Sequence, residues 1–353
     1  MKICFVIPDM SLGGSAAVVH DLIKYWPSDK DELFLVCFFN KLDDRYNDLN
    51  FKNNLKIYML NKTKTIDIKF LKLLKSVLNL IKPDVINSHL TATFYLKVIG
   101  FVGKCSILHT IHSEPKFDLP FVYRLFLKKD IRSNKIKLIG CCDYISNKAK
   151  LLYKVTCLTI KNGVQAVSIN KNKQKIENIN FLFVGRFDKV KNLPVIINAF
   201  NHIKNQNFIF RICGYGFNKV EKEIQNLISI NKNRDRIKYY GKTNFMDNIY
   251  SESDVLILVS KREGLPITIL EGIKFNLSFI VTDVGGICEY VKNDINGIVL
   301  KDNNLELLSK TIDYLLDNTD IVVRYQSNSK IISESIDSNY MANKYYKVLT
   351  DER

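Results

Sequence analysis

Two glutamates, Glu263 and Glu271, stand on either side of a Gly-Leu-Pro sequence in the stretch KREGLPITILEGIKF. Proline has no N–H to lose at a helix start, so Gly264, Leu265 and Pro266 predict a helix that begins at Leu265 or Pro266. Glu271 then lies inside this helix, about 7 to 8 Å along its axis. The N–H groups of such a helix start can bind an anion, and the carboxylates can accept hydrogen bonds from hydroxyl groups. A solvated pair of acids is the alternative, but it does not explain the Gly-Leu-Pro.

Two cations follow another strand-like run in FLFVGRFDKVKNL. The run ends at Gly185, Arg186 follows at once, and Lys191 comes just before the next helix-like segment. A planar guanidinium and a compact ammonium suit a diphosphate. Exposure of either cation to solvent is the alternative. Together with the acids they predict a site for a nucleotide sugar, with one carboxylate on the sugar side of the diphosphate and the other on the nucleoside side.

Glycines follow two further strand-like runs. Gly13 and Gly14 precede a helix rich in Ala and Val, whose first N–H groups can receive an anion. Gly214 belongs to a G-x-G in ICGYG. Each could instead form a plain tight turn, because short glycine motifs have low specificity.

The chain has five histidines, at positions 20, 89, 109, 112 and 202. His20 and His202 lie in helix-like segments and are expected to be structural. His109 and His112 lie near the end of one strand-like run, and His112 is the better candidate because it ends a T-x-H. His89 also ends a strand-like run, so a role in a pocket stays open for it.

The elements that carry these residues alternate between strand-like and helix-like segments. In the first half, strand-like runs lie at 2–7, 32–39, 55–60, 84–89, 105–112, 136–142 and 157–164, with helix-like segments such as 69–82 and 119–132. In the second half, strands are expected at 181–186, 208–214, 237–241, 254–260, 278–283 and 297–300, and helices at 193–204, 219–230, 245–252, 266–275 and 305–317. This alternation predicts parallel sheets covered on both faces, that is, two doubly wound Rossmann-like domains of the α/β class.

The polar stretch at 168–180 reads as an interdomain linker. The expected organisation is therefore an N-terminal domain at 1–170, a C-terminal domain at 178–335, and a final helix at 336–353 that could return to the first domain. Ligands of such sheets bind beside the carboxyl ends of the strands. We expect the two sheets to face a central cleft.

Composition excludes several classes of protein. The chain has 353 residues with 46% hydrophobic side chains, and its apolar runs are far shorter than the roughly 20 residues that cross a bilayer. Its start, MKICFVIPDM, resembles a first strand more than a signal peptide. The eight scattered cysteines form no C-x-x-C, which favours buried thiols in a reducing cytoplasm over disulfides or zinc.

The net charge of +16 is concentrated in the first half, where residues 1–177 hold 29 Lys and Arg against 15 Asp and Glu. Such a bias indicates a polyanionic partner, either anionic lipid or nucleic acid. Lysine-rich codon usage would act on both halves and explains the asymmetry poorly. The segment at 69–82 alternates lysines with leucines, and the segment at 121–132 places Arg124, Lys128 and Arg132 beside apolar residues. Both could lie on an anionic membrane surface, although most amphipathic helices face their own core.

The motifs resemble, in combination, the family 4 retaining glycosyltransferases of the GT-B fold that assemble bacterial surface polysaccharides. They are GG at 13–14, TIH at 110–112, KNGV at 161–164, VGR…KVKN at 184–192, EGLP…E at 263–271 and TDVGG…NGIVL at 282–300. The resemblance covers nearly the whole chain and is densest between 181 and 300. Two departures are Gly272, where alanine is usual, and Ser15-Ala16, where an acid or arginine is frequent.

The resemblance implies a role for each matching residue. Gly14, Arg186 and Lys191 would hold the donor diphosphate, Glu263 would contact the transferred sugar, Glu271 the ribose, and His112 would line the sugar pocket. The full set of expected catalytic residues is Glu263, His112, Arg186 and Lys191. The expected donor-binding residues are Gly13, Gly14, Gly185, Gly214, Gly264, Leu265, Pro266 and Glu271.

The implied reaction moves a sugar, with retention, from a UDP-sugar to a lipid-linked glycan in O-antigen, lipopolysaccharide or capsule synthesis. It needs no cofactor and no metal, and the one D-x-D, at Asp29 and Asp31, is expected at the surface. The implied location is cytoplasmic, where the basic first domain could contact the inner face of the membrane. A sugar-nucleotide 2-epimerase of the same fold and a non-catalytic nucleic-acid-binding protein are the alternatives, although no stacking motif or recognition helix supports nucleic acid.

Overall fold

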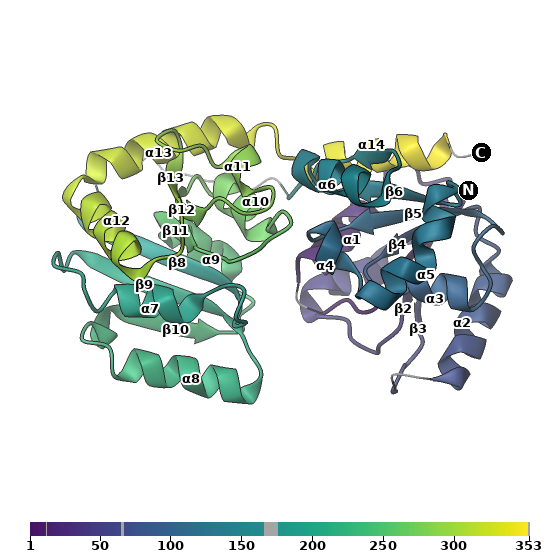
Figure 1. Ribbon diagram of the computed structural model, residues 1–353, viewed down its shortest axis with the longest axis horizontal. Coiled ribbons are helices and arrows are strands. Elements are labelled where there is room, and N and C mark those ends of the chain that lie inside the picture. Colours follow the sequence, from purple (N-terminus) through teal and green to yellow (C-terminus); the bar gives the residue numbers. More distant parts are fainter. Residues whose placement is uncertain (12, 65–66, 166–175, 352–353) are drawn as a thin grey trace. The chain divides into compact units, whose positions relative to one another are not determined.

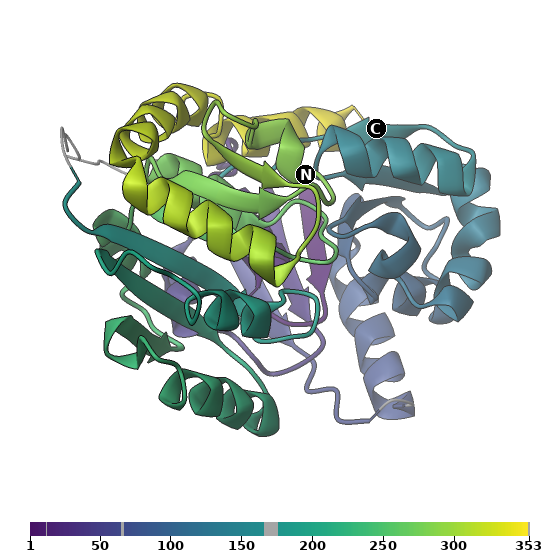
Figure 2. The ribbon, with the colours of Figure 1, turned by 60° about the vertical axis from the view of Figure 1, so that its left-hand side comes forward.

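The computed structural model describes residues 1–11, 13–64, 67–165 and 176–351. The chain divides into two compact units. Unit 1 comprises Met1–Gln165 and Asp337–Arg353, and unit 2 comprises Ala166–Ile336. Each unit is a parallel sheet with helices on both of its faces (Figures 1 and 2).

Unit 1 has seven strands in the order β3-β2-β1-β4-β5-β6-β7, all parallel. The strands are β1 (Lys2–Ile7), β2 (Glu32–Cys37), β3 (Leu55–Met59), β4 (Val85–His89), β5 (Ser106–Ile111), β6 (Ile136–Gly140) and β7 (Cys157–Thr159). Its helices are α1 (Gly14–Lys24), the 3-10 helix η1 (Asp44–Phe51), α2 (Ile68–Ile81), α3 (Ala92–Val98), α4 (Pro115–Asp118), α5 (Phe121–Arg132), α6 (Asp143–Tyr153) and α14 (Ser338–Thr350).

Unit 2 has six strands in the order β10-β9-β8-β11-β12-β13, again all parallel. The strands are β8 (Ile179–Arg186), β9 (Phe208–Tyr215), β10 (Ile237–Gly241), β11 (Val255–Leu258), β12 (Ser278–Thr282) and β13 (Gly297–Leu300). Its helices are α7 (Leu193–Ala199), α8 (Asn218–Ser229), the 3-10 helix η2 (Arg234–Arg236), α9 (Met246–Glu252), α10 (Ile267–Lys274), α11 (Ile287–Tyr290), α12 (Leu305–Asp317) and α13 (Thr319–Ser333).

The two sheets share one topology, which confirms the predicted doubly wound Rossmann-like domains. In each, the first strand lies beside the second on one side and the fourth on the other, so the strand order reverses at that point. The reversal falls between β1 and β4 in unit 1 and between β8 and β11 in unit 2. Central strands such as β4, β11 and β12 are buried along their whole length, because helices cover both faces of the sheet.

The final helix, α14, belongs to unit 1, where it packs on α1. Ser338 Oγ donates to Asp21 Oδ2 over 2.5 Å, and the Tyr345 hydroxyl lies 3.2 Å from Thr110 Oγ1 on β5. Tyr345 is fully buried, and Tyr346 contacts the ring of Trp26 edge-on. The last stretch of the chain therefore completes the core of the unit that the first stretch begins.

The bounds of most elements match the sequence prediction to within two residues, but several predictions were wrong. The strand expected at 157–164 ends at Thr159, and the helix expected at 193–204 ends at Ala199. Helices α3, α6 and α13 were not among the expected elements. Of the linker predicted at 168–180, residues 168–175 lie outside the described residues, and 179–180 already belong to β8.

Two predictions from composition concern cysteines and membrane spans. The eight cysteines, all at described positions, are thiols, six of them buried and two (Cys105 and Cys288) half-buried. Within the described part of the chain, every helix is too short or too polar to cross a bilayer.

We predict that Tyr345→Ala destabilises unit 1 by about 3 to 5 kcal/mol, because it leaves a cavity in the core. Urea unfolding followed by the fluorescence of Trp26, the single tryptophan, checks this within unit 1. Tyr340→Ala on the same helix is the matched control, since Tyr340 is exposed and its loss should change stability by no more than about 0.5 kcal/mol. Equal midpoints for the two variants would mean that α14 adds nothing to this core.

Candidate functional site

The loops that follow β8 and β11 lie at the strand reversal of unit 2 and bring two predicted site residues together. Lys191 Nζ lies 2.7 Å from Glu263 Oε1, although 72 residues separate them. The two side chains are only 15% and 11% exposed. The backbone joins the same loops, because the Lys261 N–H donates to the Val190 carbonyl over 2.8 Å. The ion pair is therefore a partly buried and anchored feature of this edge of the sheet.

Lys191 is positioned by a local turn. Asp188 Oδ1 accepts hydrogen bonds from the backbone N–H groups of Val190 (3.0 Å) and Lys191 (3.1 Å). Beneath the lysine stem lies Gly185, where an added Cβ would meet Lys191 Cε at 3.6 Å. Asn192 then adopts a left-handed conformation, with φ of 58°, before α7 begins. The turn positions the lysine, whose stem lies at van der Waals distance from Gly185.

A second loop, at 284–286, packs against the backbone of Glu263 and Gly264. The Gly286 N–H donates to the Gly264 carbonyl over 2.6 Å. Gly285 has a φ of +65°, and a Cβ there would lie 2.4 Å from the Gly264 oxygen and 2.6 Å from the Glu263 oxygen. Only glycine fits this position, on both conformational and steric grounds. The backbone that carries Glu263 is thus fixed from two sides.

Helix α10 begins one residue later than the sequence predicted. Its first residue is Ile267, and Pro266 is the N-cap residue, with φ of −66° and ψ of 125°. Leu265 and Pro266 are both buried and lie outside the helix. The proline therefore ends the approach to the helix instead of opening its first turn.

Glu271 lies inside α10 as predicted, and its carboxylate is bound by a residue that the sequence did not identify. The buried Tyr250 hydroxyl donates to Glu271 Oε2 over 2.7 Å, and its ring stacks on Phe275. Tyr250 lies between Ile249 and Ser251 in α9, where no sequence pattern marks it as a partner of an acid. This hydrogen bond fixes the rotamer of Glu271.

Three buried polar atoms, two in these loops and one in the first turn of α10, lack a hydrogen-bond partner among the residues described. They are Asn192 Nδ2, Ser260 Oγ and Thr268 Oγ1. Buried polar groups are nearly always paired with protein, water or ligand. Their concentration between Lys191 and the first turn of α10 is what a polar binding site requires.

The remaining predicted residues of unit 2 are placed differently. Arg186 ends β8, but its side chain is 66% exposed and lies 3.3 Å from Asp188 Oδ2. Gly214 has a φ of +144°, and a Cβ there would lie 1.8 Å from the Gly185 oxygen. Gly214 therefore permits the close approach of β9 to β8. Neither residue touches the Lys191–Glu263 pair through any hydrogen bond or ion pair of the described residues.

In unit 1 the predicted glycines start a helix. Gly13 is the N-cap residue of α1, in an extended conformation, and Gly14 is its first residue. A Cβ on Gly13 would meet nothing within 4 Å. The helix carries no acid in its first turn, so its N–H groups are not already neutralised by a carboxylate of that turn.

His112 belongs to a cluster of three histidines at the carboxyl ends of β4 and β5. His112 Nε2 lies 2.8 Å from Nδ1 of His89, and His109 Nε2 lies 3.0 Å from Asp118 Oδ2. Asp118 Oδ1 accepts from the backbone N–H of His112 over 3.0 Å. Burial lowers the pKa of His112 to about 4, against the opposing effect of Asp118. Burial and the neighbouring histidines hold the pKa of His89 well below its usual value. Both rings are therefore neutral at neutral pH.

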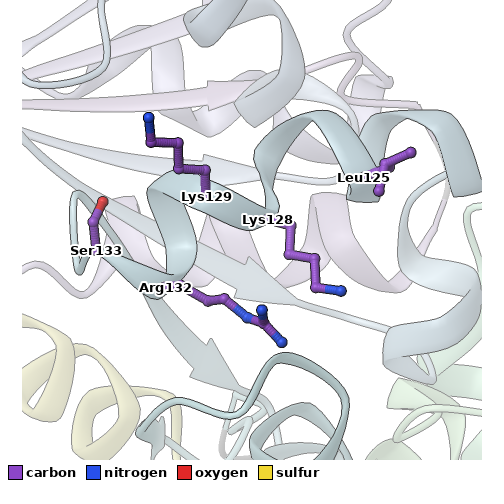
Figure 3. A pocket seen from close by; sticks show the side chains of 5 residues that line it. All are labelled: Leu125, Lys128, Lys129, Arg132 and Ser133. Atoms are coloured by element: carbon purple, nitrogen blue, oxygen red, sulfur yellow. The ribbon is translucent and has the colours of Figure 1, made fainter.

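Helix α5 of unit 1 exposes an apolar face that continues into a basic one. Phe121, Val122, Leu125 and Phe126 are 69%, 68%, 61% and 47% exposed. The next turns line a pocket with Leu125, Lys128, Lys129, Arg132 and Ser133 (Figure 3). In Figure 3, Lys128 and Arg132 extend toward the same side of the helix.

The basic stripe predicted on α5 comprises Arg124, Lys128 and Arg132. Arg124 is half-buried like Lys128, with a buried Nε atom and its guanidinium over the exposed Phe121 ring. Lys129 adds an exposed cation to the same helix. Helix α2 exposes Lys69, Lys72 and Lys75 as well, beside Leu73 and Leu80.

The D-x-D prediction was wrong for one of its two acids. Asp29 is exposed, but Asp31 is buried and accepts hydrogen bonds from the Met1 amino group (2.7 Å) and from Trp26 Nε1 (3.1 Å). Burial alone would raise the pKa of Asp31, but these bonds hold it below its usual value. Asp31 is thus a structural acid of unit 1. The described residues include no group of three or more His, Cys, Asp or Glu placed to hold a metal ion.

Comparison with known proteins places this geometry in a family context. Residues 165–331, which cover most of unit 2, match the family model described as glycosyl transferases group 1. The chain is 29% identical over 342 residues to an uncharacterized glycosyltransferase of Methanocaldococcus jannaschii, covering 92% of this chain and 90% of that one. It is also 29% identical over 269 residues, 68% of each chain, to the Escherichia coli UDP-Gal:α-D-GlcNAc-diphosphoundecaprenol α-1,3-galactosyltransferase.

A solved structure extends the likeness to both units. The Anabaena protein HepE in complex with UDP-glucose matches with a TM-score of 0.82 at 16% identity, over 99% of this chain and 100% of that one. At this identity the likeness concerns the fold alone. The predicted fold class is confirmed: the chain has two Rossmann-like domains of the GT-B fold, and residues 165–331 match the group 1 model.

Proposed function

We propose that the protein is a retaining glycosyltransferase that moves a sugar from a UDP-sugar to a lipid-linked glycan during assembly of a bacterial surface polysaccharide. The observation that carries the proposal is the Lys191–Glu263 pair, 2.7 Å apart at the strand reversal of unit 2, within the segment that matches the group 1 family. The E. coli relative, named for a UDP-Gal donor and a diphosphoundecaprenol acceptor, supports the donor and acceptor classes.

The Lys191–Glu263 pair explains how one site could bind both the diphosphate and the sugar of the donor. In the structure the ammonium of Lys191 neutralises the carboxylate of Glu263. A diphosphate offers the ammonium a stronger, doubly charged partner, and Glu263 then becomes available to accept hydrogen bonds from sugar hydroxyls. Arg186 ends β8, and its exposed guanidinium would exchange its partner Asp188 for the diphosphate. Glu271, held by Tyr250, would accept from the ribose.

Charge on the departing diphosphate is the largest electrostatic demand of the reaction. Lys191, Arg186 and the first N–H groups of α10 and α1 would stabilise that charge. In the reaction, the bond from the anomeric carbon to the phosphate oxygen breaks and a bond to the acceptor oxygen forms on the same face. The departing phosphate oxygen takes the acceptor proton. Glu263 is thereby a binding residue for the sugar, not a nucleophile, and the charge is balanced without a metal ion or a cofactor.

His112 of unit 1 would contact the transferred sugar. Neutral imidazole suits a hydrogen bond to a hydroxyl group, and burial keeps His112 neutral. The glycines at 13 and 14 would leave room for the diphosphate to approach the start of α1.

The exposed face of α5 supports a peripheral position on the inner face of the cytoplasmic membrane. Its four apolar side chains are followed by Lys128, Lys129 and Arg132. Apolar side chains beside cations fit the boundary between acyl chains and anionic headgroups, where each cation adds about 1 kcal/mol. A bilayer surface would bring the protein to an acceptor that is itself anchored in lipid.

We predict that Lys191→Ala weakens the binding of UDP and of the matching UDP-sugar alike, by about 10- to 100-fold, since a charge-assisted contact is lost. Glu263→Ala should weaken the binding of the UDP-sugar more than that of UDP, and it should lower the rate of sugar transfer at least about 100-fold. A thermal-shift panel of nucleotides and nucleotide sugars identifies the donor, and calorimetry then gives the affinities.

Lys189→Ala is the matched control for these variants, because Lys189 is an exposed lysine two residues from Lys191. A double variant, Lys191→Met with Glu263→Gln, removes both charges and separates lost contacts from the cost of one unpaired buried charge. Unchanged affinities for all nucleotides in Lys191→Ala, or unchanged turnover in Glu263→Ala, would refute the assigned roles.

We predict that reversing the three cations of α5 (Lys128→Glu, Lys129→Glu, Arg132→Glu) lowers binding to vesicles containing phosphatidylglycerol at least about 10-fold. Flotation of the full chain with these vesicles measures the bound fraction. The control reverses three exposed lysines of unit 2, Lys219, Lys222 and Lys232, and so changes the net charge equally. If both triple variants bind equally well, attraction to α5 plays no part.

A further inference from the structure

His89 is a fully buried histidine whose ring touches His112, and its sequence position alone left its role open. We infer that His89 is a positioning residue: it donates from Nδ1 to His112 Nε2 and so holds His112 in the tautomer that carries its proton on Nδ1. The inference rests on the proposed function for its consequence, since it concerns the hydrogen bond that His112 would give to the transferred sugar.

The fold brings the two rings together from neighbouring strands. His89 ends β4 opposite Thr110 of β5, and His112 follows directly after β5. The rings are tilted by 30°, their centroids lie 5.1 Å apart, and the Nδ1–Nε2 distance of 2.8 Å is that of a good hydrogen bond. The backbone of His112 is itself held by Asp118 Oδ1. The ring of His112 is therefore fixed at both its backbone and its Nε2 atom.

The other polar groups nearby do not compete for the His112 ring. Asp118 is occupied, because it accepts from His109 Nε2 through one oxygen and from the backbone N–H groups of His112 and Ser113 through the other. His109 Nδ1 is paired with Thr93 Oγ1 at 2.7 Å. His89 is thus the residue whose hydrogen bond decides which nitrogen of His112 carries the proton.

The direction of the hydrogen bond follows from the second nitrogen of the His89 ring, Nε2. His89 Nε2 is buried and has no partner among the residues that the structure describes. If His112 were the donor, His89 would carry its proton on Nε2 and bury an N–H without an acceptor. If His89 is the donor, Nε2 carries only a lone pair. Buried donors without a partner are rarer than buried acceptors without one, so His89 donates.

Charged forms of the pair are excluded at neutral pH. A proton added to either ring would place a cation in this buried cluster, and burial lowers the pKa of both His89 and His112. Neutral His112 with a proton on Nδ1 presents one N–H donor and has no lone pair left on its ring. It can hold a hydroxyl oxygen of a sugar but cannot remove a proton from one, which agrees with the departing phosphate as the base.

The test is the tautomer of His112, read from long-range nitrogen–proton correlations in the full chain labelled with ¹⁵N-histidine. His112→Gln identifies the His112 signals among those of the five histidines. At pH 7.5 the wild type should show a protonated Nδ1 and a bare Nε2 on His112. His89→Asn should preserve this pattern, because its amide can donate from nearly the same place. His89→Asp can only accept, so it should move the proton of His112 to Nε2.

The same variants test the consequence for the donor. His89→Asp should weaken the binding of the UDP-sugar about 5- to 10-fold, while the affinity for UDP changes less than about twofold. His89→Asn should keep the wild-type affinity for the UDP-sugar. Urea unfolding read by Trp26 confirms that unit 1 is intact in each variant. A wild-type His112 protonated on Nε2, or a His89→Asp variant with an unchanged tautomer, would overturn the inference. A tautomer that moves as expected without any change in sugar affinity would support it and count instead against the proposed role of His112.

Discussion

The candidate site depends on one electrostatic interaction, the ion pair between Lys191 and Glu263 where β8 and β11 end. Removing a charge from water costs several kcal/mol, and a partly buried pair repays this only in good geometry. Here the geometry is fixed by the backbone, through the Asp188 turn on one side and the tight contact of Gly264 with Gly286 on the other. Two charges held in this way are stable together and ready to separate when a ligand offers each a better partner.

The surroundings of the pair make this exchange possible. Gly285, where a side chain would collide with the Glu263 and Gly264 carbonyls, lets the loop at 284–286 pack against the backbone of Glu263. Asn192, Ser260 and Thr268 each keep a buried polar atom without a hydrogen-bond partner among the described residues. The backbone of this site is held by hydrogen bonds, whereas these three side chains keep polar groups that could donate hydrogen bonds to a diphosphate.

Much of the fold follows from the sequence, because the buried strands of a parallel sheet are short apolar runs separated by helical segments. Strand β1 was predicted at its observed bounds, and both domains were predicted with the correct topology class. Errors arose where local pattern and tertiary packing differ. Asp31 looked like a surface acid but pairs with Trp26 and the Met1 amino group, and Pro266 precedes the helix that it seemed to open.

For the same reason, only part of the candidate site could be predicted from the sequence. Lys191 and Glu263 were identified by their motifs, but their direct contact spans 72 residues, and no local pattern encodes it. Tyr250 and His89 were missed as partners of Glu271 and His112, because a tyrosine in a short helix and a histidine at a strand end carry no signal of what they touch. Their roles became evident only from the distances.

The most direct measurement is a crystal structure of the protein with bound UDP. The account predicts that Lys191 Nζ leaves Glu263 and binds an oxygen of the diphosphate, with the phosphates beside the first turn of α10 and the ribose near Glu271. A structure in which the nucleotide is bound elsewhere while the Lys191–Glu263 pair remains closed would contradict the account.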